Sequence, residues 1–170
     1  MRQPGIKEFS RITPSVGRAD DWLKDAFRHL ALARAALPDD YSESVAHSSK
    51  AVEFSAKSLM TLAGVLFPRE HVVGIGMEWV WQSLTGKDAE SVALAKRHIA
   101  RVGWVCDVVA PLQTVSEYGF AGKSTTLLVN KKDADIYLEY GAEATDIAGR
   151  VLAQVQKGAF KFSPKPGREG

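Results

Sequence analysis

Residues 47–60 read HSSKAVEFSAKSLM, a stretch in which Ala and Ser predominate and two opposite charges stand four positions apart. At about 100° per residue on a helix, Glu53 and Lys57 fall at the flank of the apolar stripe that contains Val52. On an exposed helix such a pair stabilises by only about 0.2–0.5 kcal/mol. Because small side chains let a second helix approach closely, we expect instead a partly buried ion pair at a helix–helix contact.

Helical periodicity continues on both sides of this stretch. Apolar residues recur at helical spacing in four long segments, residues 18–37, 40–66, 87–118 and 130–157, and a shorter helix is expected at 77–84. Pro38 should end the first helix and Pro68 the second, whereas Pro111 should kink or interrupt the third. Asn130, followed three positions later by Asp133, has the pattern of a helix N-cap.

These elements predict an all-α fold, an up-and-down bundle of four to five helices joined by short or medium connections. No segment makes a convincing strand, and residues 119–130 are expected to form a loop. The expected organisation is an N-terminal arm at 1–17, the helical bundle at 18–157, and a flexible basic tail at 158–170.

The composition is that of an ordinary globular domain. The chain has 170 residues, 45% hydrophobic and 25% charged, with a formal net charge of +2, so the charge alone does not indicate nucleic-acid binding. No apolar stretch is long enough for a membrane span and no signal peptide is recognisable. With Cys106 as the one cysteine, no internal disulfide is expected, and a cytoplasmic protein is the natural interpretation.

Metal and thiol chemistry have little support in the sequence. The four histidines, at 29, 47, 71 and 98, lack the three- or four-residue spacing that aims two rings at one ion, and no Glu-x-x-His motif is present. We therefore expect no metal and no cofactor. Cys106 lies on an apolar stripe, which favours a buried structural thiol over a nucleophile.

Several basic residues are candidates for binding phosphate. They lie together on the third long helix, and are Lys96, Arg97, His98 and Arg101. A solvated helix face is the favoured interpretation, with a phosphate-binding patch as the alternative. The segment GFAGKST (119–125) fails as a phosphate-binding loop because Glu117 occupies the place of its first glycine, although Lys123 could still meet an anion.

Two tryptophans, Trp79 and Trp81, alternate in a glycine-containing segment. Core packing is the default expectation for both side chains. A subunit interface and stacking on a base are the alternatives that the sequence leaves open.

Taken in order, these segments resemble the HEPN family, small helical domains named for higher eukaryotes and prokaryotes nucleotide-binding. The resemblance covers most of residues 18–156. The matching stretches are ADDWLKDAFRHLALARAAL (19–37), SSKAVEFSAKSLM (48–60) with Glu53 and Lys57, PREHVVGI (68–75) with His71, SEYG (116–119) with Tyr118, and NKKDADIYLEYGAEATDIAGRVLAQV (130–155). The chain departs from the family pattern in having Glu70 before His71 and no Arg before Tyr118.

The resemblance implies a bundle that forms homodimers and is associated with nucleotides or nucleic acids. Many relatives are encoded beside a minimal nucleotidyltransferase in two-component toxin–antitoxin modules. Others are metal-independent ribonucleases that use an Arg, four to six intervening residues, and a His. Here no Arg stands five to seven positions before any histidine.

The resemblance therefore predicts a non-catalytic protein that binds a nucleotide, RNA or a nucleotidyltransferase partner. Two alternatives stay open. One is a divergent ribonuclease in which His98 acts with an Arg or Lys across a dimer cleft. The other is a ligand-free dimeric scaffold.

Overall fold

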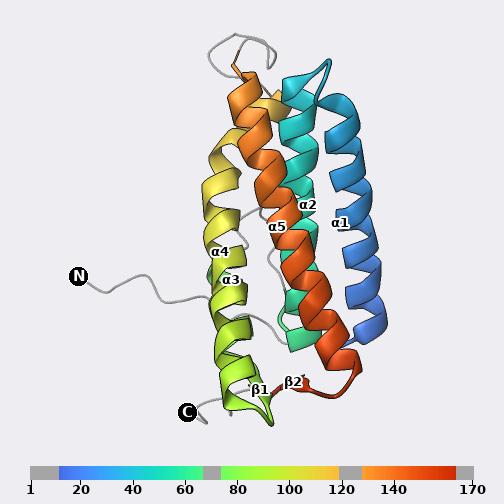
Figure 1. The fold of residues 1–170 in the computed structure, drawn as a ribbon, viewed down its shortest axis with the longest axis vertical. Coiled ribbons are helices and arrows are strands. Elements are labelled where there is room, and N and C mark those ends of the chain that lie inside the picture. Colours follow the sequence, from blue (N-terminus) through green and yellow to red (C-terminus); the bar gives the residue numbers. More distant parts are fainter. Residues whose placement is uncertain (1–11, 67–73, 119–127, 164–170) are drawn as a thin grey trace, which may run out of the picture.

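A computed structural model describes residues 12–66, 74–118 and 128–163. Within these ranges the chain forms an all-α bundle with one small pair of strands, which confirms the predicted fold class (Figure 1). The elements, in chain order, are α1 (Val16–Ala36), α2 (Tyr41–Ala63), α3 (Gly74–Ser83), β1 (Leu84–Gly86), α4 (Ala89–Tyr118), α5 (Lys131–Gln156) and β2 (Phe160–Phe162). Among the described helices, none combines the length and the apolar character needed to cross a bilayer.

Caps explain where the helices begin and end. The Ser15 side chain accepts a hydrogen bond from the backbone of α1, and Asp40 does the same for α2. At α5 the predicted cap is confirmed as a full capping box between Asn130 and Asp133. The expected end of α2 near residue 66 is wrong, because Gly64 adopts φ 70° and closes the helix there.

Pro111 does not interrupt α4, which runs without a break from Ala89 to Tyr118. The side chains of Pro111 and Asp107 both lie on the exposed side of the helix. The backbone carbonyl that loses its donor to the proline ring belongs to Asp107, four positions earlier, where water can replace the missing bond. Buried Val109 and Gln113 hold the helix on its inner side.

The expectation of no strand is wrong at two places. β1 and β2 pair antiparallel, with Leu84 opposite Phe162 and Gly86 opposite Phe160. The backbone amide of Ser163 donates to the carbonyl of Ser83 at 2.8 Å, which extends the pairing. Residues 158–163, placed in the flexible tail by the sequence, thus belong to the folded unit, and 164–170 lie outside the described residues. Three-residue strands are too short for their periodicity to be detected.

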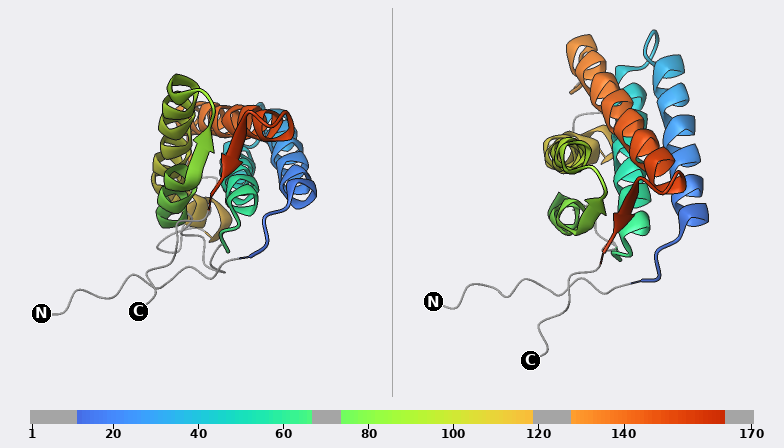
Figure 2. Two further views of the ribbon diagram at one scale, coloured as in Figure 1. Left: turned by 90° about the horizontal axis from the view of Figure 1, so that it is seen from below. Right: turned by 60° about the horizontal axis from the view of Figure 1, so that its bottom comes forward.

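The core is organised around α2. This helix packs against α1, α3, α4 and α5, and in the end-on view α1, α5 and α4 surround it (Figure 2). Small residues allow the close approach: a Cβ on Gly141 would lie 3.2 Å from the backbone oxygen of Ser48. Between the same two helices the Ser55 hydroxyl donates to the Thr145 hydroxyl at 3.2 Å. The close helix contact expected from the Ala- and Ser-rich stretch is therefore confirmed.

Candidate functional site

The basic residues of α4 lead to an aromatic and arginine-containing surface between α4 and α5. The Arg101 guanidinium donates from Nε to Oε1 of Glu143 at 3.0 Å and from Nη2 to Oε2 at 3.1 Å. Its central carbon lies 4.2 Å from the ring centroid of Trp104 and 5.8 Å from that of Tyr140. Trp104 is 47% exposed, so this arrangement faces solvent.

The Arg101 guanidinium interacts with Glu143 electrostatically. The hydrogen bonds that Arg101 donates to Glu143 raise the pKa of Arg101, with burial opposing them more weakly. Tyr140 meets the Trp104 ring edge-on, with centroids 5.9 Å apart and planes at 83°. A carboxylate, a guanidinium and two aromatic rings therefore orient one another on the surface.

The basic residues that the sequence places together on this helix lie on two different sides of α4. At about 100° per residue, Arg97, His98 and Arg101 fall on the α5 side of α4, whereas Lys96 falls about 140° from Arg101, on the α3 side. Arg97 is exposed and His98 half-buried. We call Arg97, His98, Arg101, Trp104, Tyr140 and Glu143 the α4–α5 face.

Glu53 and Lys57 form a partly buried ion pair, as expected. Lys57 Nζ lies 2.6 Å from Glu53 Oε1, and the side chains are 17% and 13% exposed. The ammonium group also lies 5.1 Å from the ring centroid of Trp22 in α1 and 5.2 Å from that of Phe54. Gln113 Nε2 in α4 donates to Glu53 Oε2 at 3.5 Å. The pair therefore connects α1, α2 and α4, which is a structural role.

Two histidines that are distant in sequence meet between α1 and α2. His29 Nδ1 lies 2.9 Å from His47 Nδ1, and His47 Nε2 lies 3.6 Å from a Glu43 oxygen. Burial, and then the neighbouring His47, lower the pKa of His29. Sequence spacing missed this pair because the connection folds the two helices back on each other. Residues 12–66, 74–118 and 128–163 contain no cluster of three side chains able to hold a metal ion.

Cys106 and Tyr118 lie on α4. Cys106 is 4% exposed, and burial raises its pKa to about 12, so the prediction of a structural thiol is confirmed. Tyr118 is the last residue of α4. His71 and Lys123 lie outside the described residues.

The expectation of core packing is wrong for Trp79 and agrees with the position of Trp81, and the sequence analysis overlooked Trp104. Trp79 is 40% exposed, which contradicts core packing, whereas Trp81 is partly buried against the core. Trp104 was overlooked, although it stands off the apolar stripe of its helix and was for that reason recognisable as a surface aromatic. Its neighbour Glu143 carried no such signal, because its contact with Arg101 joins residues 42 positions apart.

Comparison with known proteins gives a family match and no individual relative. The model of the HEPN domain matches residues 19–152, which is most of the chain and includes α2, α3 and α4 entirely and most of α1 and α5. No curated protein and no solved structure matches the sequence. HEPN domains are a family associated with nucleotides and RNA. This chain belongs to the HEPN domain family.

Proposed function

We propose that this HEPN protein binds a nucleotide or RNA without cleaving it, and that the α4–α5 face is its binding surface. The observation that carries the proposal is the Arg101 guanidinium held against the exposed ring of Trp104 by Glu143. An exposed aromatic ring beside cationic groups is the arrangement that proteins use for unpaired bases, because every base offers a flat face for stacking.

The surrounding charges suit a phosphate next to that base. Arg97 lies one turn before Arg101 on the same side of α4, and His98 lies beside them. Glu143 competes with a phosphate for Arg101, because the carboxylate already accepts two of its hydrogen bonds. We therefore expect modest affinity that falls as salt rises.

The absence of catalysis is part of the proposal. Proton transfer by a histidine together with charge stabilisation by an arginine would require both groups to reach one phosphate. Arg101, one turn from His98, is engaged by Glu143 instead. The spacing of Arg and His found in the family ribonucleases is also missing from the sequence.

Homodimer formation and a nucleotidyltransferase partner complete the proposal. Large apolar side chains on the surface of the described chain support protein contacts: Phe27 is 53% exposed and Leu94 is 46% exposed. Light scattering coupled to gel filtration tests the dimer. Co-purification with a minimal nucleotidyltransferase encoded by a neighbouring gene, if one is present, tests the partner.

Binding is tested by fluorescence anisotropy with a labelled mixed-sequence RNA octamer and by competition with ATP. Trp104→Leu should weaken RNA binding about tenfold or more, because stacking contributes about 1–3 kcal/mol per base. Arg97→Ala should weaken binding and lower the salt dependence by about one phosphate contact. Arg34→Ala, an exposed arginine on α1, is the matched control and should bind normally.

Two results would overturn the proposal. Wild-type protein that gives no salt-sensitive binding to RNA or ATP excludes the α4–α5 face as a nucleotide site. Cleavage of a mixed RNA pool that disappears in His98→Ala establishes the ribonuclease alternative.

A further inference from the structure

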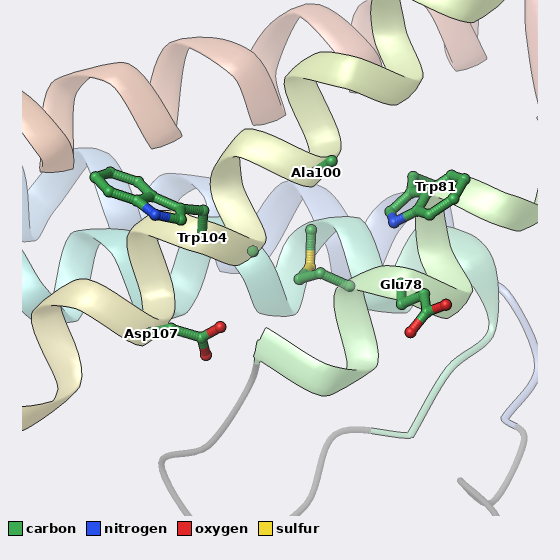
Figure 3. A pocket seen from close by; sticks show the side chains of 7 residues that line it. Glu78, Trp81, Ala100, Trp104 and Asp107 are labelled. Atoms are coloured by element: carbon green, nitrogen blue, oxygen red, sulfur yellow. The ribbon is translucent and has the colours of Figure 1, made fainter.

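A pocket of about 280 Å³, which shares Trp104 with the α4–α5 face, lies between α3 and α4 (Figure 3). Trp81 from α3 and Trp104 from α4 stand at opposite ends of it, with the carboxylate of Glu78 below Trp81 and that of Asp107 below Trp104. A volume of this size is enough for a single planar group rather than a whole nucleotide.

The pocket exists because α4 presents small residues toward α3. Ala100 and Gly103 lie three positions apart, and Asp107 follows on the same side of the helix. Met77, which is 1% exposed, contributes a buried apolar surface to the lining. Two indoles and two carboxylates thus border a space that the backbone of α4 leaves open.

The two carboxylates make the pocket acidic. Gln82 Nε2 donates a hydrogen bond to Glu78 Oε1 at 2.8 Å, and Glu78 is exposed. In the described part of the chain, neither Glu78 nor Asp107 forms an ion pair with a lysine or arginine. Lys96, one turn before Ala100, is the nearest basic residue on this side of α4 by helical position.

We propose that this pocket binds a guanidinium group. A guanidinium is flat, so it stacks on an indole, and its N–H groups match the geometry of carboxylates. The central carbon of the Arg101 guanidinium already lies 4.2 Å from the centroid of the Trp104 ring, so this indole can contact a guanidinium. The phosphates of a nucleotide, in contrast, would be repelled by Glu78 and Asp107.

This inference does not depend on the proposed nucleotide binding. Glu78, Trp81 and Asp107 lie on the α3 side of α4, and Arg97, His98 and Arg101 lie on its α5 side. Trp104 stands at the boundary between the two. Variants at Glu78 and Asp107 therefore report on the pocket, and variants at Arg97 report on the α4–α5 face.

The test uses the indole N–H signals of the four tryptophans in a ¹⁵N NMR spectrum. Arginine capped at both ends should shift the signals of Trp81 and Trp104 saturably, with a Kd of about 1–10 mM, and leave Trp22 in place. Capped citrulline has the same shape but no charge and should bind at least about tenfold more weakly. Comparison with agmatine distinguishes whether the natural guanidinium belongs to a polypeptide or to a small amine. Tighter binding of capped arginine than of agmatine indicates a polypeptide ligand, and tighter binding of agmatine indicates a small amine.

Matched variants assign the binding to the pocket. Asp107→Asn and Glu78→Gln should each weaken capped arginine about tenfold, whereas Glu139→Gln on α5 should not. Ala100→Leu fills the pocket and should abolish binding, while Ala93→Leu, at another exposed position of α4, leaves it intact.

Three outcomes would overturn the inference. The first is that capped arginine and capped citrulline bind equally tightly. The second is that capped arginine causes no saturable shift of the indole signals at concentrations about tenfold above that Kd. The third is that guanosine binds saturably and capped arginine does not. Guanosine is the informative competitor because its base also stacks and donates to carboxylates.

Discussion

Lys57 Nζ lies 2.6 Å from Glu53 Oε1 at a point where α1, α2 and α4 meet and both side chains are largely buried. Removing one partner leaves the other charge in this poorly hydrated environment. We predict that Glu53→Gln lowers the free energy of unfolding by about 1–3 kcal/mol, measured by urea denaturation.

The double variant Glu53→Leu, Lys57→Met provides the control for this prediction, since it removes both charges. It should recover part of the lost stability. Asp20→Asn, which breaks the exposed pair between Asp20 and Lys24, should leave stability unchanged. A Glu53→Gln protein as stable as wild type, with the same oligomeric state, would show that the ion pair does not hold the helices in register.

The pair of His29 and His47 predicts a dependence of stability on pH. Burial and the neighbouring ring lower the pKa of His29 below its usual 6.5, so the unfolded chain binds this proton more readily than the folded chain. The stability contributed by the neutral His29 ring is fully present above pH 6.5 and is lost as the pH falls below that value. We predict that the midpoint of urea unfolding drops between pH 7 and pH 5.

The variant His29→Asn should flatten this pH profile, because the group that takes up the proton on unfolding is gone. His98→Asn, which changes a histidine outside the pair, should keep the slope of the wild type. Equal slopes for wild type and His29→Asn would contradict the role of the pair.

The close contact of α2 and α5 predicts opposite effects for two glycines of one helix. A Cβ on Gly141 would lie 3.2 Å from the Ser48 backbone oxygen, and buried helix backbone cannot easily move away. A Cβ on Gly149 meets only the Leu23 Cδ2 atom, at an ordinary 3.8 Å. We predict that Gly141→Ala destabilises by about 1 kcal/mol, and that Gly149→Ala stabilises by up to about 1 kcal/mol through helix propensity.

Thermal denaturation of the two variants measures the difference. Because both gain the same helix propensity, their comparison isolates the packing between α2 and α5. Stabilisation of similar size in both would mean that the two helices have room to separate.

Burial also predicts the chemical behaviour of Cys106. Its pKa is raised to about 12 by burial, so hardly any thiolate exists at neutral pH. We predict that the native protein resists alkylation by iodoacetamide over hours and that the same thiol reacts fully in urea, as followed by mass spectrometry. Rapid labelling of the native protein would show that α4 opens locally.

The sequence predicted the bundle because its helices are long and their apolar stripes are clear. Val52 and Glu53 illustrate this: counting 100° steps was enough to place one side chain in the core and the other at its flank. The cap at Asn130 was equally predictable from the sequence, since an N-cap depends on residues only three positions apart.

The candidate site was less predictable because its contacts join different helices. Arg101 was found from its neighbours on α4, but its partner Glu143 lies on α5, and helix packing, not spacing, brings them together. The same is true of His29 and His47. For the strands, three residues are too few to show an alternation, and a glycine such as Gly86 argues against a strand.

The pairing of β1 with β2 has a consequence for how the protein is made. Thr85 bonds with Lys161, 76 positions later, so α3 and the beginning of α4 are tied down only after nearly all of the described chain has left the ribosome. Until then α3 packs against α4 and α2. Helix α3, which carries Glu78 and Trp81, is therefore among the last parts of the molecule to reach its final packing during synthesis.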